Sequence, residues 1–326
     1  MAFPTDRARR LRRTAALRRL VEQTRLHPAD FVLPLFVKEG LAEPHDVTSM
    51  PGVQQHSLDS LRKTANEAVT AGVGGLILFG IPTHKDATGT QADAEDGIVQ
   101  QALRLLRADL GDSTVVMADL CLCEYTDHGH CGPLTADKST VDNDVTLMRY
   151  ASVARAQVEA GADVVAPSGM MDGQVGVIRD AIDTAGYADR TILAYASKYA
   201  SAFYGPFRDA AESTPSFGDR RSYQMNPANG DEALREVFAD LDQGADAVMV
   251  KPAGAYLDVI ARVSDVVDVP VAAYQVSGEY AMIEAAAAQG WIERERAIAE
   301  SVTSIKRAGA HTILTYWATE LALSLR

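Results

Sequence analysis

The chain has 326 residues, 47% of them hydrophobic, and a formal net charge of −13. This length exceeds a mean domain but fits one α/β barrel with insertions, and the acidic balance argues against binding to a nucleic-acid backbone, which needs a basic face. No apolar run approaches the ~18 residues of a membrane span. We therefore expect a globular enzyme in the cytoplasm, with no nucleic-acid or membrane partner.

The first segment differs from the rest in charge. Residues 1–26 carry eight arginines and two acids, a net +6, so the remaining chain carries −19. An arginine-rich start resembles a targeting peptide by composition, although Asp6 and Glu22 interrupt it.

From residue 31 onward, short β-branched apolar runs alternate with longer segments of helical spacing. Their almost continuous hydrophobicity predicts parallel strands that are covered on both faces. The expected strands are 31–37, 75–80, 114–120, 163–168, 191–196, 247–251, 269–276 and 313–317. The helical spacing is clearest in 61–70, 98–110 and 145–160.

Four joins between a helix and the next strand share a glycine, at Gly72, Gly161, Gly244 and Gly309. A glycine just past a helix end takes a left-handed backbone without a Cβ penalty. Eight β/α units in one chain predict an α/β fold with a closed (β/α)8 barrel, a TIM barrel. A doubly wound open sheet is the alternative.

One connection, residues 203–232, is too long for a minimal barrel and is rich in Gly, Pro, Ser and Arg. Loops of this length in compact domains are usually functional, often as active-site lids, and a solvated excursion is the alternative. Because Arg208, Arg220 and Arg221 are suited to pair with substrate carboxylates, we predict a lid.

Candidate catalytic residues follow the predicted strands, because active sites in such barrels lie at the carboxyl ends of the strands and in the loops after them. The polar residues at these ends are Asp119, Ser168, Lys198, Lys251, Ser277 and Tyr316.

Lysine is rare in this chain, with seven lysines against 24 arginines, yet two lysines end apolar strands. Desolvation there would lower the pKa of Lys251 and free its amine for attack on a carbonyl carbon, and a nearby Lys198 would act in the same direction. The pair predicts Schiff-base chemistry. The alternative is that each lysine reaches solvent or pairs with a carboxylate.

All three cysteines, Cys121, Cys123 and Cys131, lie within eleven residues. A structural zinc site normally has four protein ligands, so three thiolates leave one position for water or substrate and predict a catalytic zinc. His128 or His130 in the fourth position would instead make the site structural. A redox pair fits poorly, because C-x-C lacks the usual C-x-x-C spacing.

Several long segments, in the right order along the whole chain, resemble the porphobilinogen synthase family, also called 5-aminolevulinate dehydratases. They are 119–132, 166–168, 170–173, 203–209, 222–227, 249–258 and 274–280. The resemblance implies a (β/α)8 lyase of haem biosynthesis. Such an enzyme condenses two 5-aminolevulinate molecules into porphobilinogen with loss of two waters.

The resemblance also assigns residues. Lys251 is implied to form a Schiff base with the first substrate, at the P side, and Lys198 to engage the second substrate, at the A side. Asp119 and Ser168 are implied to assist proton transfers. The implied carboxylate-binding residues are Ser277 and Tyr316 at the P side and Arg208, Arg220 and Gln224 at the A side.

The resemblance also implies which metals the enzyme binds. With all three cysteines present, the chain resembles the zinc-dependent members, in which zinc acts as a Lewis acid on the second substrate. Glu236 falls where many bacterial members bind an allosteric magnesium at a subunit interface. Near that region Gly169 and Gln174 depart from the family's usual aspartate and arginine. An ordinary exposed helix residue is the alternative for Glu236.

Residues 1–30 resemble the family's N-terminal arm, which wraps a neighbouring subunit, and 31–326 form the catalytic barrel. The resemblance implies a homo-octamer built from dimers.

Two other functions stay open. A class I aldolase or related Schiff-base lyase would leave the cysteines and the second lysine unexplained, and a non-catalytic zinc-binding scaffold would form no pyrrole.

Overall fold

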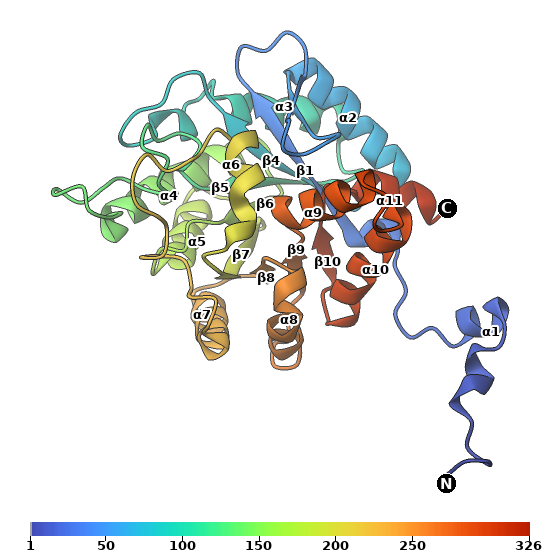
Figure 1. Cartoon of the computed structure of the whole chain (residues 1–326). Coiled ribbons are helices and arrows are strands. Elements are labelled where there is room, and N and C mark those ends of the chain that lie inside the picture. The colour runs from blue at the N-terminus through green and yellow to red at the C-terminus, as the bar shows by residue number, and fades with distance from the viewer. Residues whose placement is uncertain (1) are drawn as a thin grey trace.

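In the computed structural model, which describes residues 2–326, the chain winds around a closed parallel β-barrel (Figure 1). The barrel strands are β1 (Phe31–Lys38), β4 (Gly75–Ile81), β5 (Val115–Leu120), β6 (Val164–Pro167), β7 (Thr191–Lys198), β8 (Ala247–Lys251), β9 (Val271–Tyr274) and β10 (Thr312–Leu314). Each strand pairs in parallel with the next, and β10 pairs with β1, Phe31 opposite Ile313. This closure confirms the predicted (β/α)8 barrel and excludes the open sheet.

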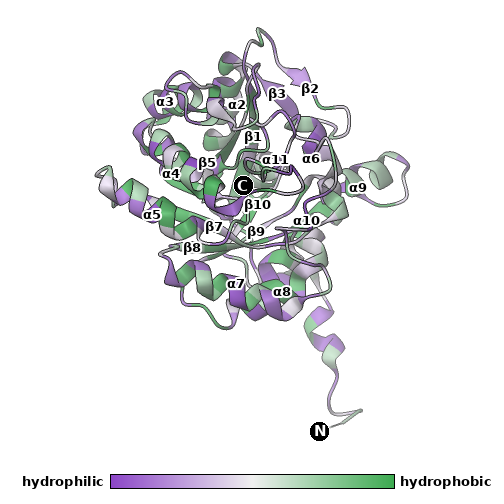
Figure 2. Cartoon of the chain, turned by 90° about the vertical axis from the view of Figure 1, so that its left-hand side faces the viewer, coloured by the Kyte–Doolittle hydropathy of each residue, from purple (hydrophilic) through white to green (hydrophobic). Residues whose placement is uncertain are grey.

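Helices surround the barrel. They are α2 (Leu58–Ala71), α3 (Ile98–Leu110), α4 (Asn143–Glu159), α5 (Gln174–Thr184), α6 (Gly205–Ala210), α7 (Gly230–Asp242), α8 (Leu257–Ser264), α9 (Ser277–Ala288), α10 (Arg294–Arg307) and α11 (Ala318–Ser324). Figure 2 shows both hydrophilic and hydrophobic stretches on α5, α7 and α8, as expected for helices with one face on the strands. Every predicted strand and helix is present, with ends shifted by a few residues.

Local sequence signals explain where the elements begin and end. Helix α2 starts after Ser57, whose side chain accepts a hydrogen bond from the Ser60 N–H, and it ends at Gly72 with φ of 92°. All four glycines predicted at helix ends adopt a positive φ. The predicted left-handed turns are confirmed.

Continuous burial of the strands makes the core. All seven residues of β4 are buried, and so are all but the last residue of β1. Two short strands extend the sheet beyond the barrel: β3 (Gln54–His56) pairs in parallel with the end of β1, and β2 (His45–Asp46) pairs antiparallel with β3. Barrel strands such as β1 and β4 are buried on both faces, which explains the nearly continuous apolar runs in the sequence.

Residues 2–30 form an arm that extends away from the barrel (Figure 1). It contains a 3-10 turn, η1 (Ala8–Arg12), helix α1 (Ala15–Leu20) and a second turn, η2 (Pro28–Asp30). No residue of η1 or α1 is buried. Within residues 2–326, no helix combines the length and the apolar character that a membrane span needs.

The predicted lid, 203–232, is only partly irregular. The turn η4 (Ala202–Tyr204) and helix α6 occupy its start, and α7 begins at Gly230, which leaves 211–229 without helix or strand. Pro206 lies in the first turn of α6, a position that suits proline because its missing N–H would have no partner there. Two further 3-10 turns are η3 (Thr90–Ala92) and η5 (Gly254–Tyr256).

Candidate active site

The two predicted lysines end neighbouring strands. Lys198 is the last residue of β7 and Lys251 the last of β8, and the two are direct partners in the β7–β8 register. Adjacent strands lie about 4.8 Å apart, and partners in a parallel pair face the same side. The amines lie 5.6 Å and 5.0 Å from the ring centre of Tyr195. The structure therefore brings the predicted pair together.

Lys251 lies in an aromatic enclosure. Its Nζ is within 4.0–5.6 Å of four ring centres, those of Tyr195, Tyr204, Phe207 and Tyr274. The residue is only 5% exposed, and no carboxylate of the described chain pairs with it. Burial, with the charge of Lys198, lowers the pKa of Lys251 to about 7. A large share of this amine is thus neutral near pH 7, as a nucleophile requires.

Lys198 is also buried, and its ammonium donates to the backbone carbonyl oxygen of Ser168. Neither lysine reaches solvent, and neither makes an ion pair within residues 2–326. The alternative of a solvated or carboxylate-paired lysine is therefore wrong for both.

A carboxyl group stands beside the lysines. Asp119 is near the end of β5, and the Ser168 hydroxyl, which follows β6, donates to Asp119 Oδ2 at 3.0 Å. Burial and the nearby Glu124 raise the pKa of Asp119 to about 8. Its Oδ1 has no partner in the described part of the chain. A neutral carboxyl with a free oxygen is equipped to give and take protons.

The three cysteines meet after β5. Their Sγ atoms all lie within 4.8 Å of one another, and Cys121 and Cys123 are 3.4 Å apart. All three are buried and free. Four tetrahedral ligands with Zn–S of about 2.3 Å place sulfurs about 3.8 Å apart, so the set fits a zinc ion. Across residues 2–326, no other group of His, Cys, Asp or Glu is as compact.

The two histidines of the same loop lie outside this group. His130 Nδ1 lies 3.1 Å from the Tyr223 hydroxyl, and its Nε2 lies 3.1 Å from the Phe217 carbonyl oxygen. His128 Nδ1 accepts from the His130 N–H at 3.1 Å. Because their ring nitrogens have other partners, a closed site with a histidine ligand finds no support in this geometry.

Helix α6 and the segment after it carry donors without acceptors. Arg220 is 5% exposed and donates through Nη2 to the carbonyl oxygens of Gly129 and Ser213, each at 2.8 Å. Among the buried donor atoms of this part of the described chain that lack a hydrogen-bond partner are Arg208 Nε, Arg220 Nε and Gln224 Nε2. Buried donors left unpaired are costly.

The charges around these donors point to an anion. Burial and the charge of Arg220 lower the pKa of Arg208, and no acid of residues 2–326 pairs with either arginine. A substrate carboxylate would satisfy both. Arg221 differs, because it is exposed and pairs with Asp219 at 3.5 Å.

The remaining predicted residues lie next to the lysine enclosure. Ser277, the first residue of α9, is fully buried. Its Oγ accepts from the Phe207 N–H at 2.9 Å and donates to the Phe203 carbonyl oxygen at 3.3 Å. The Tyr316 hydroxyl is 3.1 Å from that of Tyr274, and the Tyr274 ring centre lies 4.0 Å from the Lys251 amine. The hydroxyls of Ser277 and Tyr316 thus border the Lys251 side of the site.

The sequence over residues 5–324 matches the family model described as delta-aminolevulinic acid dehydratase. The chain belongs to this family.

Relatives in the delta-aminolevulinic acid dehydratase family match along the whole chain. It is 62% identical to the Streptomyces coelicolor enzyme, with 100% of this chain and 98% of the relative covered, and 61% identical to that of Mycobacterium tuberculosis H37Rv, with 98% of each covered. A solved structure of the Toxoplasma gondii ME49 enzyme in complex with its product porphobilinogen superposes with a TM-score of 0.94. It is 39% identical, over 97% of this chain and 90% of that one.

These comparisons confirm the predicted family, fold and activity: the chain is a delta-aminolevulinic acid dehydratase, a lyase of porphyrin biosynthesis. They leave the aldolase and the non-catalytic scaffold without support.

Local contacts explain why Gly169 and Gln174 stand where the family pattern has an aspartate and an arginine. A Cβ at Gly169 would lie 1.7 Å from the Tyr150 hydroxyl, which donates to the Cys131 carbonyl oxygen at 2.7 Å. Tyr150 therefore fills the space in which an aspartate would stand. Gln174 begins α5 and accepts from the Met171 N–H at 3.2 Å.

Glu236 on α7 is half-buried, so it is not the ordinary exposed residue of the alternative. It borders a cavity of about 380 Å³ together with Asp172 and Glu232. Burial and these two acids raise the pKa of Glu236. Magnesium at this position stays a prediction.

Sequence reasoning missed the enclosure of Lys251. Tyr195 and Tyr274 lie on β7 and β9, and Tyr204 and Phe207 come from η4 and α6. A tyrosine at the carboxyl end of a barrel strand was the available signal, since that end carries the active site. The buried Glu279, at the start of α9, was also missed.

Proposed function

We propose that this enzyme condenses two molecules of 5-aminolevulinate into porphobilinogen, with Lys251 and Lys198 as the amines that bind the two substrate ketones. The observation that carries the proposal is the register pairing of two buried lysines, neither with a carboxylate partner in the described chain. A donor cluster suited to a carboxylate lies on α6 and the segment after it.

Lys251 performs the first step. Its neutral Nζ adds to the ketone carbon of the first substrate, and the ketone oxygen leaves as water after accepting two protons. Asp119 supplies a proton from its neutral carboxyl and recovers one afterwards, while Ser168 fixes the orientation of that carboxyl by its 3.0 Å hydrogen bond. The surrounding rings exclude bulk water from the amine.

The carboxylates of the two substrates are held apart. Arg208, Arg220 and Gln224 hold that of the second substrate, and this satisfies their three unpaired donor atoms. Ser277 and Tyr316 hold that of the first, on the Lys251 side. The second lost water comes from the ketone of the second substrate, activated by Lys198.

Cys121, Cys123 and Cys131 would hold zinc, since three buried sulfurs at this spacing suit that ion. When bound, zinc would supply a Lewis acid for the second substrate. Arg220 lies close enough to Cys123 and Cys131 for their thiolates to raise its pKa, which is otherwise lowered by burial. A carboxylate bound by Arg220 would therefore lie near a zinc ion held by these cysteines.

Borohydride trapping tests the proposal. The enzyme is mixed with 5-aminolevulinate, reduced with sodium borohydride and digested, and the modified peptide is identified by mass spectrometry. We expect an adduct on Lys251 and pyrrole formation with Ehrlich's reagent, lost on chelation and restored by zinc. An unmodified Lys251, or full activity without zinc, would contradict the corresponding assignment.

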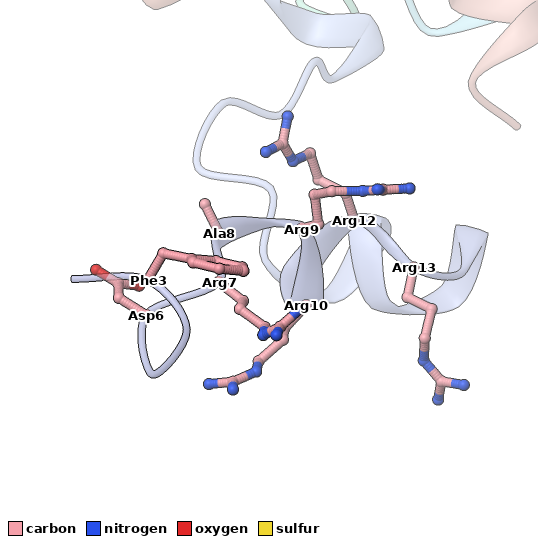
Figure 3. A pocket seen from close by; sticks show the side chains of 8 residues that line it. All are labelled: Phe3, Asp6, Arg7, Ala8, Arg9, Arg10, Arg12 and Arg13. Atoms are coloured by element: carbon pink, nitrogen blue, oxygen red, sulfur yellow. The ribbon is translucent and has the colours of Figure 1, made fainter.

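The arm, residues 1–30, is proposed to bind neighbouring subunits in a homo-octamer. Its support is exposure: Phe3, Leu11 and Leu20 are 76%, 55% and 74% exposed. Figure 3 shows the arginines of 7–13 pointing in different directions around η1, where they would meet an acidic body. Light scattering of a variant without residues 2–24 should show a smaller assembly.

Magnesium at Glu236 belongs to the same proposal, supported by the acids around it. Magnesium should stimulate the wild-type enzyme and not Glu236→Gln. Equal stimulation of the two proteins by magnesium would show that Glu236 does not bind the ion.

A further inference from the structure

Glu279 is a buried carboxylate that the chemistry above does not use. It lies in the first turn of α9 and is 6% exposed. No lysine or arginine of residues 2–326 pairs with it. Its contacts are backbone N–H groups: Oε1 accepts from Gly254 at 2.5 Å and Oε2 from Val276 at 2.7 Å.

These two N–H groups belong to the segments that carry the site. Gly254 follows Lys251 by three residues, and Val276 directly precedes Ser277. The backbone N–H groups of Ala253 and Ala255 also act on Glu279, and they oppose the rise in its pKa that burial causes. The carboxylate thus lies at the start of α9, where the helix dipole favours a negative charge, and it also accepts from the first residue of η5.

The β8–β9 ladder ends just before the reacting groups. Its last pair is Val250 opposite Ala273, and the next residues along the two strands are Lys251 and Tyr274. On the β7 side, the Lys251 carbonyl oxygen accepts from the Tyr199 N–H at 2.9 Å. On the β9 side the ladder pairing ends at this point, and beyond it the Glu279 carboxylate bonds both chains, through the Gly254 N–H and the Val276 N–H.

The close fit at Gly254 supports this role. A Cβ at this position would lie 2.5 Å from Glu279 Oε1. Only glycine lets the backbone approach the carboxylate so closely.

We infer that Glu279 is a positioning residue, which sets the Lys251 amine against the Tyr274 ring and the Ser277 hydroxyl by bonding the backbone on both sides. The inference rests on the proposed function of Lys251. Without this bridge, Lys251 shifts out of its enclosure. A displacement of about 1 Å at a reacting group costs up to ~100-fold in rate.

The test compares Glu279→Gln with a matched control on the same helix, Glu284→Gln. Glu284 is also a largely buried carboxylate, which accepts from the Trp317 indole N–H at 2.7 Å and pairs with Arg294. It does not touch the Lys251 segment. In Glu279→Gln the amide NH₂ would face a backbone N–H, so one of the two bonds is lost.

The measurement is the rate of borohydride-trapped adduct at Lys251 with 5-aminolevulinate, as a function of pH. We expect Glu279→Gln to slow trapping at least ~10-fold and to move its pH midpoint upward, toward an ordinary lysine. Zinc content should stay unchanged, and Glu284→Gln should keep the wild-type midpoint. Glu279→Asp, which keeps the charge but is one methylene shorter, should trap faster than Glu279→Gln.

Gly254→Ala keeps the test decisive if Glu279→Gln does not fold, because it displaces the carboxylate without removing it. It should show the same upward shift. A wild-type enzyme that traps on Lys251 while Glu279→Gln and Gly254→Ala keep its rate and midpoint would overturn the role of Glu279. Equal shifts in Glu284→Gln would do the same. A wild-type enzyme without the Lys251 adduct would instead refute the proposed function.

Discussion

Removal of the charge of Lys198 should raise the pH at which Lys251 reacts. A lysine with an ordinary pKa of about 10.4 is neutral in roughly one molecule in 2,500 at pH 7, whereas at a pKa of about 7 half are neutral. Burial is the larger cause of this difference, and the positive charge of Lys198 is the second. Lys198→Met keeps the bulk of the side chain and removes that charge.

The size of the effect follows from the geometry. Both amines lie within 5.6 Å of the Tyr195 ring centre, so they are at most about 11 Å apart. Two unit charges at about 11 Å repel by about 1.5 kcal/mol at an effective dielectric constant of about 20, which is about one pKa unit. A shorter separation gives a stronger repulsion and a larger shift in the pKa of Lys251. Asp119 responds as well: the charge of Lys198 lowers the pKa of its buried carboxyl, so in Lys198→Met that carboxyl stays neutral to a higher pH.

The assay is the pH dependence of borohydride trapping of one substrate on Lys251, which does not need the second substrate. In Lys198→Met we expect the midpoint to rise by about one pH unit, while the maximal rate at high pH approaches that of the wild type. Lys63→Met, on the exposed face of α2, is the control and should leave the midpoint unchanged. A midpoint in Lys198→Met that stays in place or falls would refute the coupling of the two amines.

Three further changes test other parts of the site. Cys131→Ser should lower the bound zinc per chain and, in step with it, the rate of pyrrole formation, which metal analysis and Ehrlich's assay on one sample will show. Arg208→Gln should weaken binding of the second substrate and raise KM at least ~10-fold while leaving the Lys251 adduct intact, because a charge-assisted bond is worth about 1.5–3 kcal/mol. Gly169→Ala should lower the free energy of unfolding by about 1–3 kcal/mol in urea, since the new Cβ overlaps the Tyr150 hydroxyl. Gly176→Ala, whose Cβ meets nothing closer than 3.6 Å within a helix, should stabilise by about 0.5–1 kcal/mol, and a loss equal to that of Gly169→Ala would contradict the steric account.

The sequence predicted the barrel because the evidence for it is local. Each strand such as β4 is apolar along its whole length, and each helix such as α3 shows its own spacing, so neither depends on distant residues. The strand ends then gave the catalytic candidates, since closure of the barrel brings those ends together. Lys198 and Lys251 could be paired in this way although 53 residues separate them.

The surroundings of those residues could not be predicted in the same way. The four rings around Lys251 come from two strands, a 3-10 turn and α6, and no spacing in the chain relates them. The exclusion of aspartate at 169 by Tyr150 depends on a contact between α4 and the loop after β6. Such contacts are properties of packing, which a single sequence does not display.

Helix α6 contributes one residue to each side of the proposed site. Its neighbouring residues Phe207 and Arg208 face different groups: the Phe207 ring lies 5.2 Å from the Lys251 amine, and Arg208 lies near enough to Arg220 for their charges to interact.

The end of α6 is anchored to the barrel rim. The Gln55 amide donates to the Ala210 carbonyl oxygen at 2.8 Å, Lys85 donates to the Glu212 carbonyl oxygen at 2.6 Å, and Lys38 pairs with the Glu212 carboxylate. Because Phe207 and Arg208 are adjacent on this anchored helix, the position of the ring beside the Lys251 amine and that of the guanidinium are fixed together, as the proposed binding of the second carboxylate by Arg208 requires.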